Sequence, residues 1–266
     1  MVVLSLNTVA PAAMHALAAS REGRVLGWGP RAGYVQLDSF VLAVNPAGTP
    51  LMPNGVTVEV ATLPPISGRQ TWVDAGLIRT HGLSLVWDPT APPVWDPRVS
   101  SQVVTRETVE ARGRAIAEIT GRLRLDVHPA ALEAGGTLRQ GADVLVAARE
   151  MLGRGPGLTP EGDDVLAGAV ATVRAFGGAC GLDPDRWVAP FEELDLDGFT
   201  TGLSATLLRL ALRGHVIQPV RPLLDLSRQA SSSDVEKLLR VGHSTGRAYA
   251  AAIAGTAAAL AATAPG

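Results

Sequence analysis

Cysteine is almost absent: Cys180 is the only one in the chain. An internal disulfide is therefore excluded, and a chain without disulfides fits a reducing compartment. Cys180 lies in the segment Phe-Gly-Gly-Ala-Cys-Gly, where nothing nearby would activate a thiolate. We expect a cytoplasmic protein whose chemistry does not depend on cysteine.

Lysine is also scarce, and basic residues do not outnumber acidic ones. Lys237 is the only lysine, the formal net charge is −2 at pH 7, and the isoelectric point is near 6.2. Proteins that bind nucleic acid usually carry a basic face that neutralises phosphates. The composition therefore predicts no nucleic-acid partner.

Long, strongly apolar runs are missing. Residues 1–6 lack the basic segment that opens a secretory signal. The most apolar stretch, residues 248–264, is mostly alanine, and such small residues suit a tightly packed buried helix better than a membrane span. We expect a soluble protein with no membrane partner.

The first hundred residues have the pattern of a β-rich domain. Apolar and polar residues alternate in Val56-Thr-Val-Glu-Val60, and four of the five tryptophans fall in this half, where they can fill a small barrel or sandwich. The predicted strands are short and separated by Gly, Pro or Asn: residues 24–28, 34–44, 56–62, 71–79 and 83–87. A short helix is predicted at 12–20.

A proline-rich stretch at 88–101 separates this half from a helical one. From there to the end of the chain, apolar residues recur at the spacing typical of helices. The predicted helices cover residues 109–123, 138–152, 160–176, 185–194, 201–213, 220–228 and 231–241. The sequence thus predicts an α+β protein, with a β-rich N-terminal domain at 1–104 (small barrel or sandwich) and an all-helical domain at 105–266.

A glycine-rich loop at 153–159 joins two of these helices. It follows a helix, so it is not a dinucleotide-binding fingerprint, and it lacks the Lys-Ser/Thr end of a P-loop. Glycines at 155 and 157 permit positive φ and can direct several backbone amides at one anion near a helix N-terminus. Thr159 is predicted to cap the helix, with Pro160 as its first residue.

The same helix begins with acidic residues, Asp163 and Asp164 among them. Neighbouring side chains on a helix point about 100° apart, so one acid can face a ligand while the other bonds a neighbouring helix start. Both are candidate catalytic residues and candidate ligands of a divalent ion, with Mg²⁺ as the candidate, because phosphate bound beside bare carboxylates would be repelled. The alternative is that they only complement the helix dipole.

Two more polar segments open helices in this half. Thr201 and Ser204 begin one helix, and His243, Ser244 and Thr245 begin the last. Hydroxyls and amides at helix starts suit capture of phosphate or carboxylate, and His243 is a candidate acid or base. We predict that the three helix starts converge on one site; the alternative is that each hydroxyl is only a cap.

The pattern Gly-x-Gly-Pro-Gly-Leu-Thr-Pro-x-Gly-Asp-Asp-x-Leu-x-Gly at 153–168 resembles the signature of the AllH/YlbF family. Members supply one subunit of bacterial oxamate carbamoyltransferase. Two weaker motifs agree in order and spacing: Thr-Thr-x-Leu-Ser-Ala from residue 200, and Val-Gly-His-Ser-Thr-Gly at 241–246, where the family commonly has serine in place of Thr245.

The resemblance implies a carbamoyltransferase subunit acting on oxamate, oxalurate or a related small amide in purine (allantoin) catabolism, together with other subunits. In that interpretation the loop residues bind phosphate or carbamoyl phosphate, the two aspartates hold a metal ion or the amide, and the last helix start orients the carbonyl. The expected substrate-binding residues are Gly155, Gly157, Leu158, Thr159, Thr201, Ser204, Ser244 and Thr245. Two alternatives are a non-catalytic scaffold that binds a small anion and a metal-dependent amidohydrolase.

Overall fold

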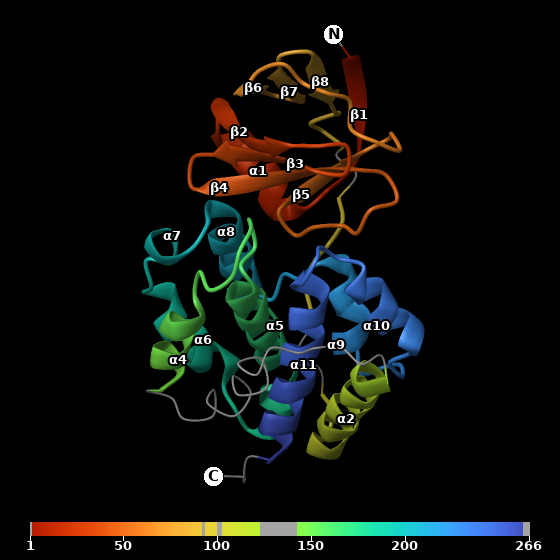
Figure 1. Ribbon diagram of the computed structural model, residues 1–266, viewed down its shortest axis with the longest axis vertical. Helices are drawn as coiled ribbons and strands as arrows, with labels where there is room; N and C mark the ends of the chain where they lie inside the picture. The colour runs from red at the N-terminus through yellow and green to blue at the C-terminus, as the bar shows by residue number, and fades with distance from the viewer. Residues whose placement is uncertain (1, 92–93, 100–102, 123–142, 263–266) are drawn as a thin grey trace. The chain divides into compact units, whose positions relative to one another are not determined.

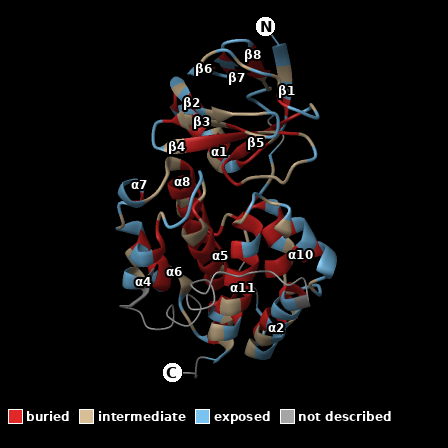
Figure 2. Cartoon of the chain, viewed as in Figure 1, coloured by how far each residue is buried: buried red, intermediate tan, exposed pale blue. Residues whose placement is uncertain are grey.

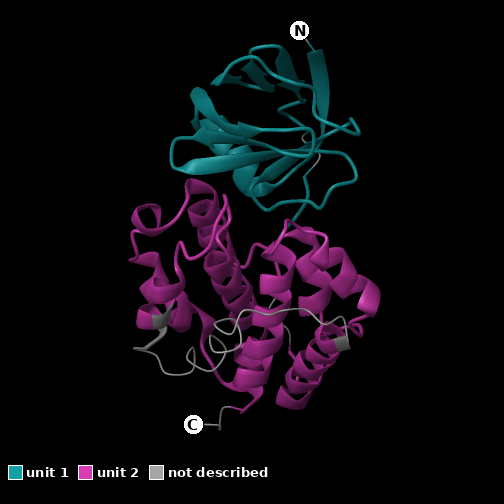
Figure 3. Ribbon diagram, in the orientation of Figure 1, with its two compact units in different colours: residues 1–97 teal, residues 98–266 magenta. Residues whose placement is uncertain are grey.

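The computed structural model describes residues 2–91, 94–99, 103–122 and 143–262. The chain divides into two compact units, Met1–Pro97 and Arg98–Gly266, and each is described by itself (Figure 3). The division falls inside the proline-rich stretch, where neighbouring prolines favour extended backbone over helix or sheet.

The first unit is a closed β-barrel, so the barrel alternative of the predicted α+β fold is confirmed. Its strands follow the order β1-β5-β4-β3-β2-β6-β7-β8, and the barrel closes by parallel pairing of β8 with β1 (Figure 1). The bounds are β1 Val2–Val9, β2 Glu22–Trp28, β3 Gly33–Leu37, β4 Phe40–Pro46, β5 Gly55–Val58, β6 Gln70–Asp74, β7 Leu77–Thr80 and β8 Leu83–Val86.

Two predicted strands each proved to be two strands, and one further strand was missed. The predicted strand at 34–44 is two strands, because Asp38 adopts a φ of 50° and reverses the chain between β3 and β4. The predicted strand at 71–79 is also two, with Gly76 at a φ of 75° between β6 and β7. The sequence analysis missed β1, whose first residues carry the exposed Val2 and Val3 and so hide the alternation.

The barrel interior is aliphatic. Val44, Val56 and Val58 come from adjacent strands and are almost fully buried. Helix α1 (Pro11–Ala19) adds Leu17 to this core. β-Branched side chains pack well on pleated strands, which explains why valine dominates.

The second unit is helical, as predicted. Its helices are α2 Arg106–Arg122, α4 Asp143–Met151, α5 Glu161–Phe176, α6 Pro184–Glu192, α7 Leu196–Phe199, α8 Gly202–Leu212, α9 Arg221–Leu224, α10 Ser232–Leu239 and α11 Thr245–Ala262. The N-terminal part of the helix predicted at 138–152 lies outside the described residues. Within those residues, no helix combines the length and hydropathy needed to cross a bilayer.

Helices α5 and α11 form the centre of this unit and are buried along most of their length (Figure 2). They approach closely because the facing residues are small: a Cβ added to Gly168 of α5 would lie 2.9 Å from the Cβ of Ala252 on α11. This packing explains the alanine-rich sequence of α11. It also places the first turns of the two helices beside the glycine loop.

Candidate active site

The glycine loop connects the end of α4 to the start of α5. Its three glycines, Gly153, Gly155 and Gly157, have φ values of +70°, +121° and +98°, in the left-handed region that L side chains rarely adopt. Most of the loop is exposed. Within the described residues, the backbone amides of Gly155, Gly157 and Leu158 have no hydrogen-bond partner in the protein. The loop thus presents unpaired donors to solvent.

The two outer glycines are required for different reasons. A Cβ on Gly153 would collide with the carbonyl oxygen of Phe199, so the loop packs directly against the backbone before α8. A Cβ on Gly157 would meet nothing within 4 Å. Gly157 is therefore needed for its backbone conformation alone, or for what binds there.

The predicted cap of α5 was wrong. The helix begins at Glu161, Pro160 occupies the N-cap position, and no side chain caps the helix. The hydroxyl of Thr159 is instead 3.2 Å from the hydroxyl of Thr245, at the start of α11. Thr159 was assigned to the wrong partner because capping is a local rule, whereas this contact spans 86 residues.

Asp163 holds the loop in place. Its side chain is almost fully buried, and its Oδ1 accepts a 2.8 Å hydrogen bond from the backbone N–H of Gly153. Its Oδ2 accepts a hydrogen bond from the hydroxyl of Thr200. Both oxygens therefore bind protein donors, and the carboxyl ties the glycine loop to the segment before α8.

Asp164 faces the other way, towards α11, and is also almost fully buried. Burial raises the pKa of its carboxyl from 3.8 to about 8; a hydrogen bond with Thr245 opposes this shift, while the charges of Asp163 and Glu161 add to it. Its Oδ2 is buried without a hydrogen-bond partner. Burial therefore favours the protonated form of this carboxyl.

Tyr249 lies one turn further along α11 and was missed by the sequence analysis. It is buried, and burial together with the charge of Asp164 raises the pKa of its phenol. The signal in the sequence was weak, since a tyrosine in an alanine-rich helix looks like ordinary core. Asp164 and Tyr249 are nevertheless two titratable groups that interact in the interior of the helical unit.

The start of α8 matches the prediction. Thr201 is its N-cap, and its hydroxyl oxygen accepts a 3.2 Å hydrogen bond from the N–H of Ser204. The same hydroxyl donates a 2.5 Å hydrogen bond to the carbonyl of Leu158 in the glycine loop. Ser204 is buried, and its Oγ has no partner.

The three residues predicted at the start of α11 differ in their position relative to the site. Thr245 is buried and contacts the loop through Thr159. Ser244 is half-buried in the preceding turn, whereas His243 is exposed. Within the described part of the chain, His243 has no side-chain partner, so the structure does not bring it to the buried carboxyls.

The glycine loop therefore meets both other helix starts. Leu158 bonds the start of α8 and the next residue, Thr159, bonds the start of α11. The structure brings together Asp163, Asp164, Thr159, Thr201 and Thr245. The loop is the element that joins them.

The proposed metal site has little support from the donor set. Among the described residues, no group of three or more histidine, cysteine, aspartate or glutamate side chains could hold a metal ion. Asp163 already accepts two hydrogen bonds. A Mg²⁺ ion at this site would therefore need substrate oxygens or water for most of its ligands.

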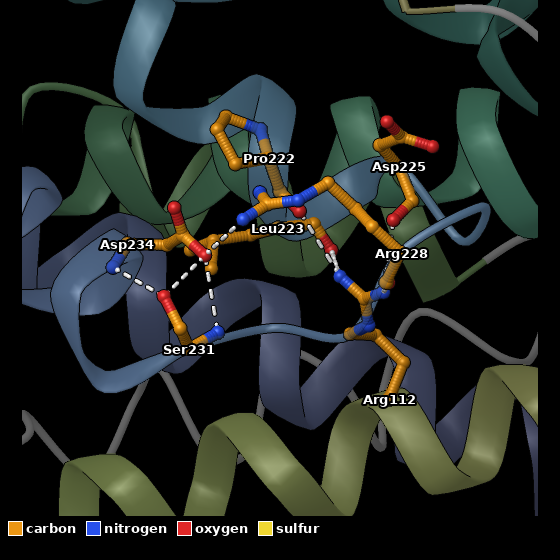
Figure 4. Close-up of polar contacts among 7 residues, drawn as sticks. All are labelled: Arg112, Pro222, Leu223, Asp225, Arg228, Ser231 and Asp234. Atoms are coloured by element: carbon orange, nitrogen blue, oxygen red, sulfur yellow. Dashed lines mark hydrogen bonds and ion pairs between the residues drawn. The ribbon is translucent and has the colours of Figure 1, made fainter.

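A second buried polar cluster supports the α9–α10 segment and was not predicted (Figure 4). The guanidinium of Arg112, on α2, donates hydrogen bonds to four backbone carbonyls: those of Pro222, Leu223, Asp225 and Arg228. Burial lowers the pKa of Arg112. Four acceptors on one cation lock the end of α9 to α2.

The chain after this cluster is fixed by a capping box. Ser231 caps α10, and its hydroxyl accepts a 3.2 Å hydrogen bond from the N–H of Asp234, whose Oδ2 in turn accepts one of 3.0 Å from the N–H of Ser231. Arg228 adds a 2.9 Å ion pair to the same carboxylate. The capping box is a local feature, because Ser231 and Asp234 are only three residues apart.

The fold and the site together define a class: a barrel-containing protein whose helical unit carries a glycine loop, unpaired amides and two buried carboxyls. Residues 151–258 match the family model described as oxamate carbamoyltransferase subunit AllH. The match begins at the end of α4 and runs through the loop to α11, so it covers every element of the site, and the resemblance seen in the sequence is confirmed over this segment. No solved structure matches the chain.

Proposed function

We propose that the chain is one subunit of a carbamoyltransferase that acts on oxamate or oxalurate, with carbamoyl phosphate as the second substrate. The observation that carries the proposal is the family match, which spans residues 151–258 and includes all three helix starts joined by the loop. The word subunit in the family description favours partner subunits.

The exposed loop suits the phosphate end of such a substrate. The amides of Gly155, Gly157 and Leu158 are unpaired within the described residues, and the loop leads directly into the positive end of α5. Leu158 then contributes mainly its backbone and Thr159 its hydroxyl, while Thr201 fixes the position of the loop. Ser204 and Ser244 are further hydroxyls near the two helix starts.

Two other functions remain as alternatives. A scaffold that binds a small anion would use the same loop without catalysis. A metal-dependent amidohydrolase would use the carboxyl pair, but Asp163 is already engaged by Gly153 and Thr200. The transferase is favoured because the family match points to it.

The test is to purify the tagged full-length chain from its own cells with the subunits that remain bound. Oxalurate formation from carbamoyl phosphate and oxamate is then measured for this assembly and for the isolated chain. Turnover by the assembly supports the proposal, and turnover by the isolated chain would place the whole site in this subunit. Ammonia release that needs a metal but no phosphate would support the amidohydrolase instead.

A further inference from the structure

The two adjacent aspartates have different bonding. Both oxygens of Asp163 are bound by protein donors, from Gly153 and Thr200. Thr245 interacts with the Asp164 carboxyl and favours its charged form, but Oδ2 of Asp164 is buried with no hydrogen-bond partner. A buried polar atom without a partner costs free energy, so it calls for an explanation.

We propose that Asp164, through Oδ2, is the subsite for the uncharged amide or carbamoyl end of the substrate, while the phosphate end stays on the exposed glycine loop. This inference rests on the proposed function, because it names the part of that substrate which each part of the site binds. It assigns Oδ2 of Asp164 as the hydrogen-bonding atom for this end of the substrate and not as a metal ligand.

Charge favours an amide here over a phosphate. The charges of Asp163 and Glu161 already act on the Asp164 carboxyl, and burial opposes ionisation. A phosphate dianion placed against this group would add like charge in a site of low dielectric. A primary amide carries no net charge, and its N–H groups can donate to the unpartnered Oδ2 of Asp164.

Position links this subsite to the loop. Thr159 is half-buried at the end of the exposed loop, Thr245 is 9% exposed, and Asp164 is 2% exposed. The hydroxyls of Thr159 and Thr245 are 3.2 Å apart, and Thr245 contacts the carboxyl. The series thus runs from the solvent-facing loop to the Asp164 carboxyl, and an amide that displaces Thr159 from Thr245 would approach that group.

The test compares two ligands of nearly the same shape, oxamate and oxalate, which differ only in whether an amide or a carboxylate stands at one end. Binding is measured by calorimetry on the full-length chain purified with its bound subunits. We expect wild type to bind oxamate at least tenfold more tightly than oxalate. This comparison uses only the wild-type protein, so its result does not depend on whether a substituted variant folds.

Substitutions then test the hydrogen-bonding role of Asp164. Asp164→Asn keeps a neutral donor and acceptor, and oxamate affinity should stay within about threefold of wild type. Asp164→Leu removes both and should weaken oxamate binding by about tenfold or more. The matched control is Thr256→Val, which removes another buried, unpartnered oxygen from the same unit and should leave binding unchanged.

Failure of this inference differs from failure of the proposed function. If oxalate binds as tightly as oxamate, or if Asp164→Asn loses binding as fully as Asp164→Leu, Asp164 is not a neutral amide subsite, even if the assembly turns over. If the assembly neither binds oxamate nor forms oxalurate, the proposed function is wrong and this inference falls with it.

Discussion

The Thr159 and Thr245 hydroxyls, 3.2 Å apart, join the glycine loop to the first turn of α11. Because Thr245 also bonds Asp164, one hydroxyl connects the exposed loop to a buried carboxyl. The loop conformation and the environment of the carboxyl are therefore coupled through a single side chain.

Replacing Thr245 with valine should remove this connection. We expect a loss of about 1–3 kcal/mol in the free energy of unfolding, because a buried carboxyl loses a hydrogen-bond partner while the shape of the side chain is kept. Urea unfolding measures the change. The control is Thr256→Val on the same helix, which removes a hydroxyl whose oxygen has no partner and should be neutral or stabilising. Equal losses in both variants would show that Thr245 is only core filler.

Stability should depend on pH through Asp164. Its pKa is raised from 3.8 to about 8 by folding, so the folded state holds a proton that the unfolded state releases. Stability from this group is therefore fully present below about pH 4 and is lost progressively up to about pH 8. The loss amounts to several kcal/mol, because each tenfold difference in proton affinity between the folded and unfolded states corresponds to about 1.4 kcal/mol.

The measurement is urea unfolding of wild type and Asp164→Asn between about pH 5 and pH 9, a range that spans the folded-state pKa. Because asparagine does not titrate, the variant should gain stability relative to wild type as the pH rises, and the difference should level off above about pH 8. Asp195→Asn, at an exposed aspartate, should follow wild type throughout. A difference that does not change with pH would show that Asp164 is not protonated in the folded state.

Gly157→Ala tests the loop as an anion site. No atom lies within 4 Å of the added Cβ, so the cost to folding is backbone strain alone, about 1–2 kcal/mol. If the Gly157 amide contacts phosphate, affinity for inorganic phosphate or carbamoyl phosphate should fall roughly tenfold or more, because a bond to a charged group is worth about 1.5–3 kcal/mol.

The matched control is Gly48→Ala in the barrel, since Gly48 has a φ of +80° and open space around its Cβ position. It should lose similar stability and keep the wild-type affinity. Calorimetric titration and thermal melting of the two variants provide the comparison. Wild-type phosphate affinity in Gly157→Ala would remove the loop amides from the proposed site.

Asp163→Asn should loosen the loop. The asparagine retains one acceptor but sets an amide donor against either Gly153 N–H or the Thr200 hydroxyl, both of which donate to Asp163. We expect a loss of about 2–3 kcal/mol in the free energy of unfolding and faster amide exchange at Gly153. Asp197→Asn, which breaks an exposed ion pair with Arg209, should cost no more than about 1 kcal/mol. Exchange at Gly153 as slow as in wild type would contradict the anchoring role.

Arg112→Met should destabilise the helical unit strongly, by about 3–5 kcal/mol, since four carbonyls lose their shared donor. Arg112→Lys should recover only part of this loss, because an ammonium cannot span the same fork of acceptors. Thermal unfolding measures both variants. Arg114→Met, which loses only an exposed pair with Glu110, is the control and should change stability by less than about 1 kcal/mol. A small effect of Arg112→Met would mean that water replaces the guanidinium.

Local patterns in the sequence were sufficient for much of the fold. Alternation predicted a β-rich half and helical periodicity predicted a helical half. The helix start at Thr201 was recognised because capping depends on residues only a few positions apart. The loop at 153–157 was also recognisable, since three glycines in five residues favour positive φ. The order of the barrel strands was not predictable, because β4 and β5 pair in parallel and β1 closes onto β8.

The site itself was decided by tertiary structure. Asp163 and Asp164 look alike in the sequence, yet one binds Gly153 and Thr200 while the other is buried against α11 with an unpartnered oxygen. Their different environments come from the helices that pack against α5, and a pKa near 8 arises only when burial removes the water around the carboxyl. The sequence determined which residues are available for chemistry, and the packing of α5 between α8 and α11 determined what each of them can do.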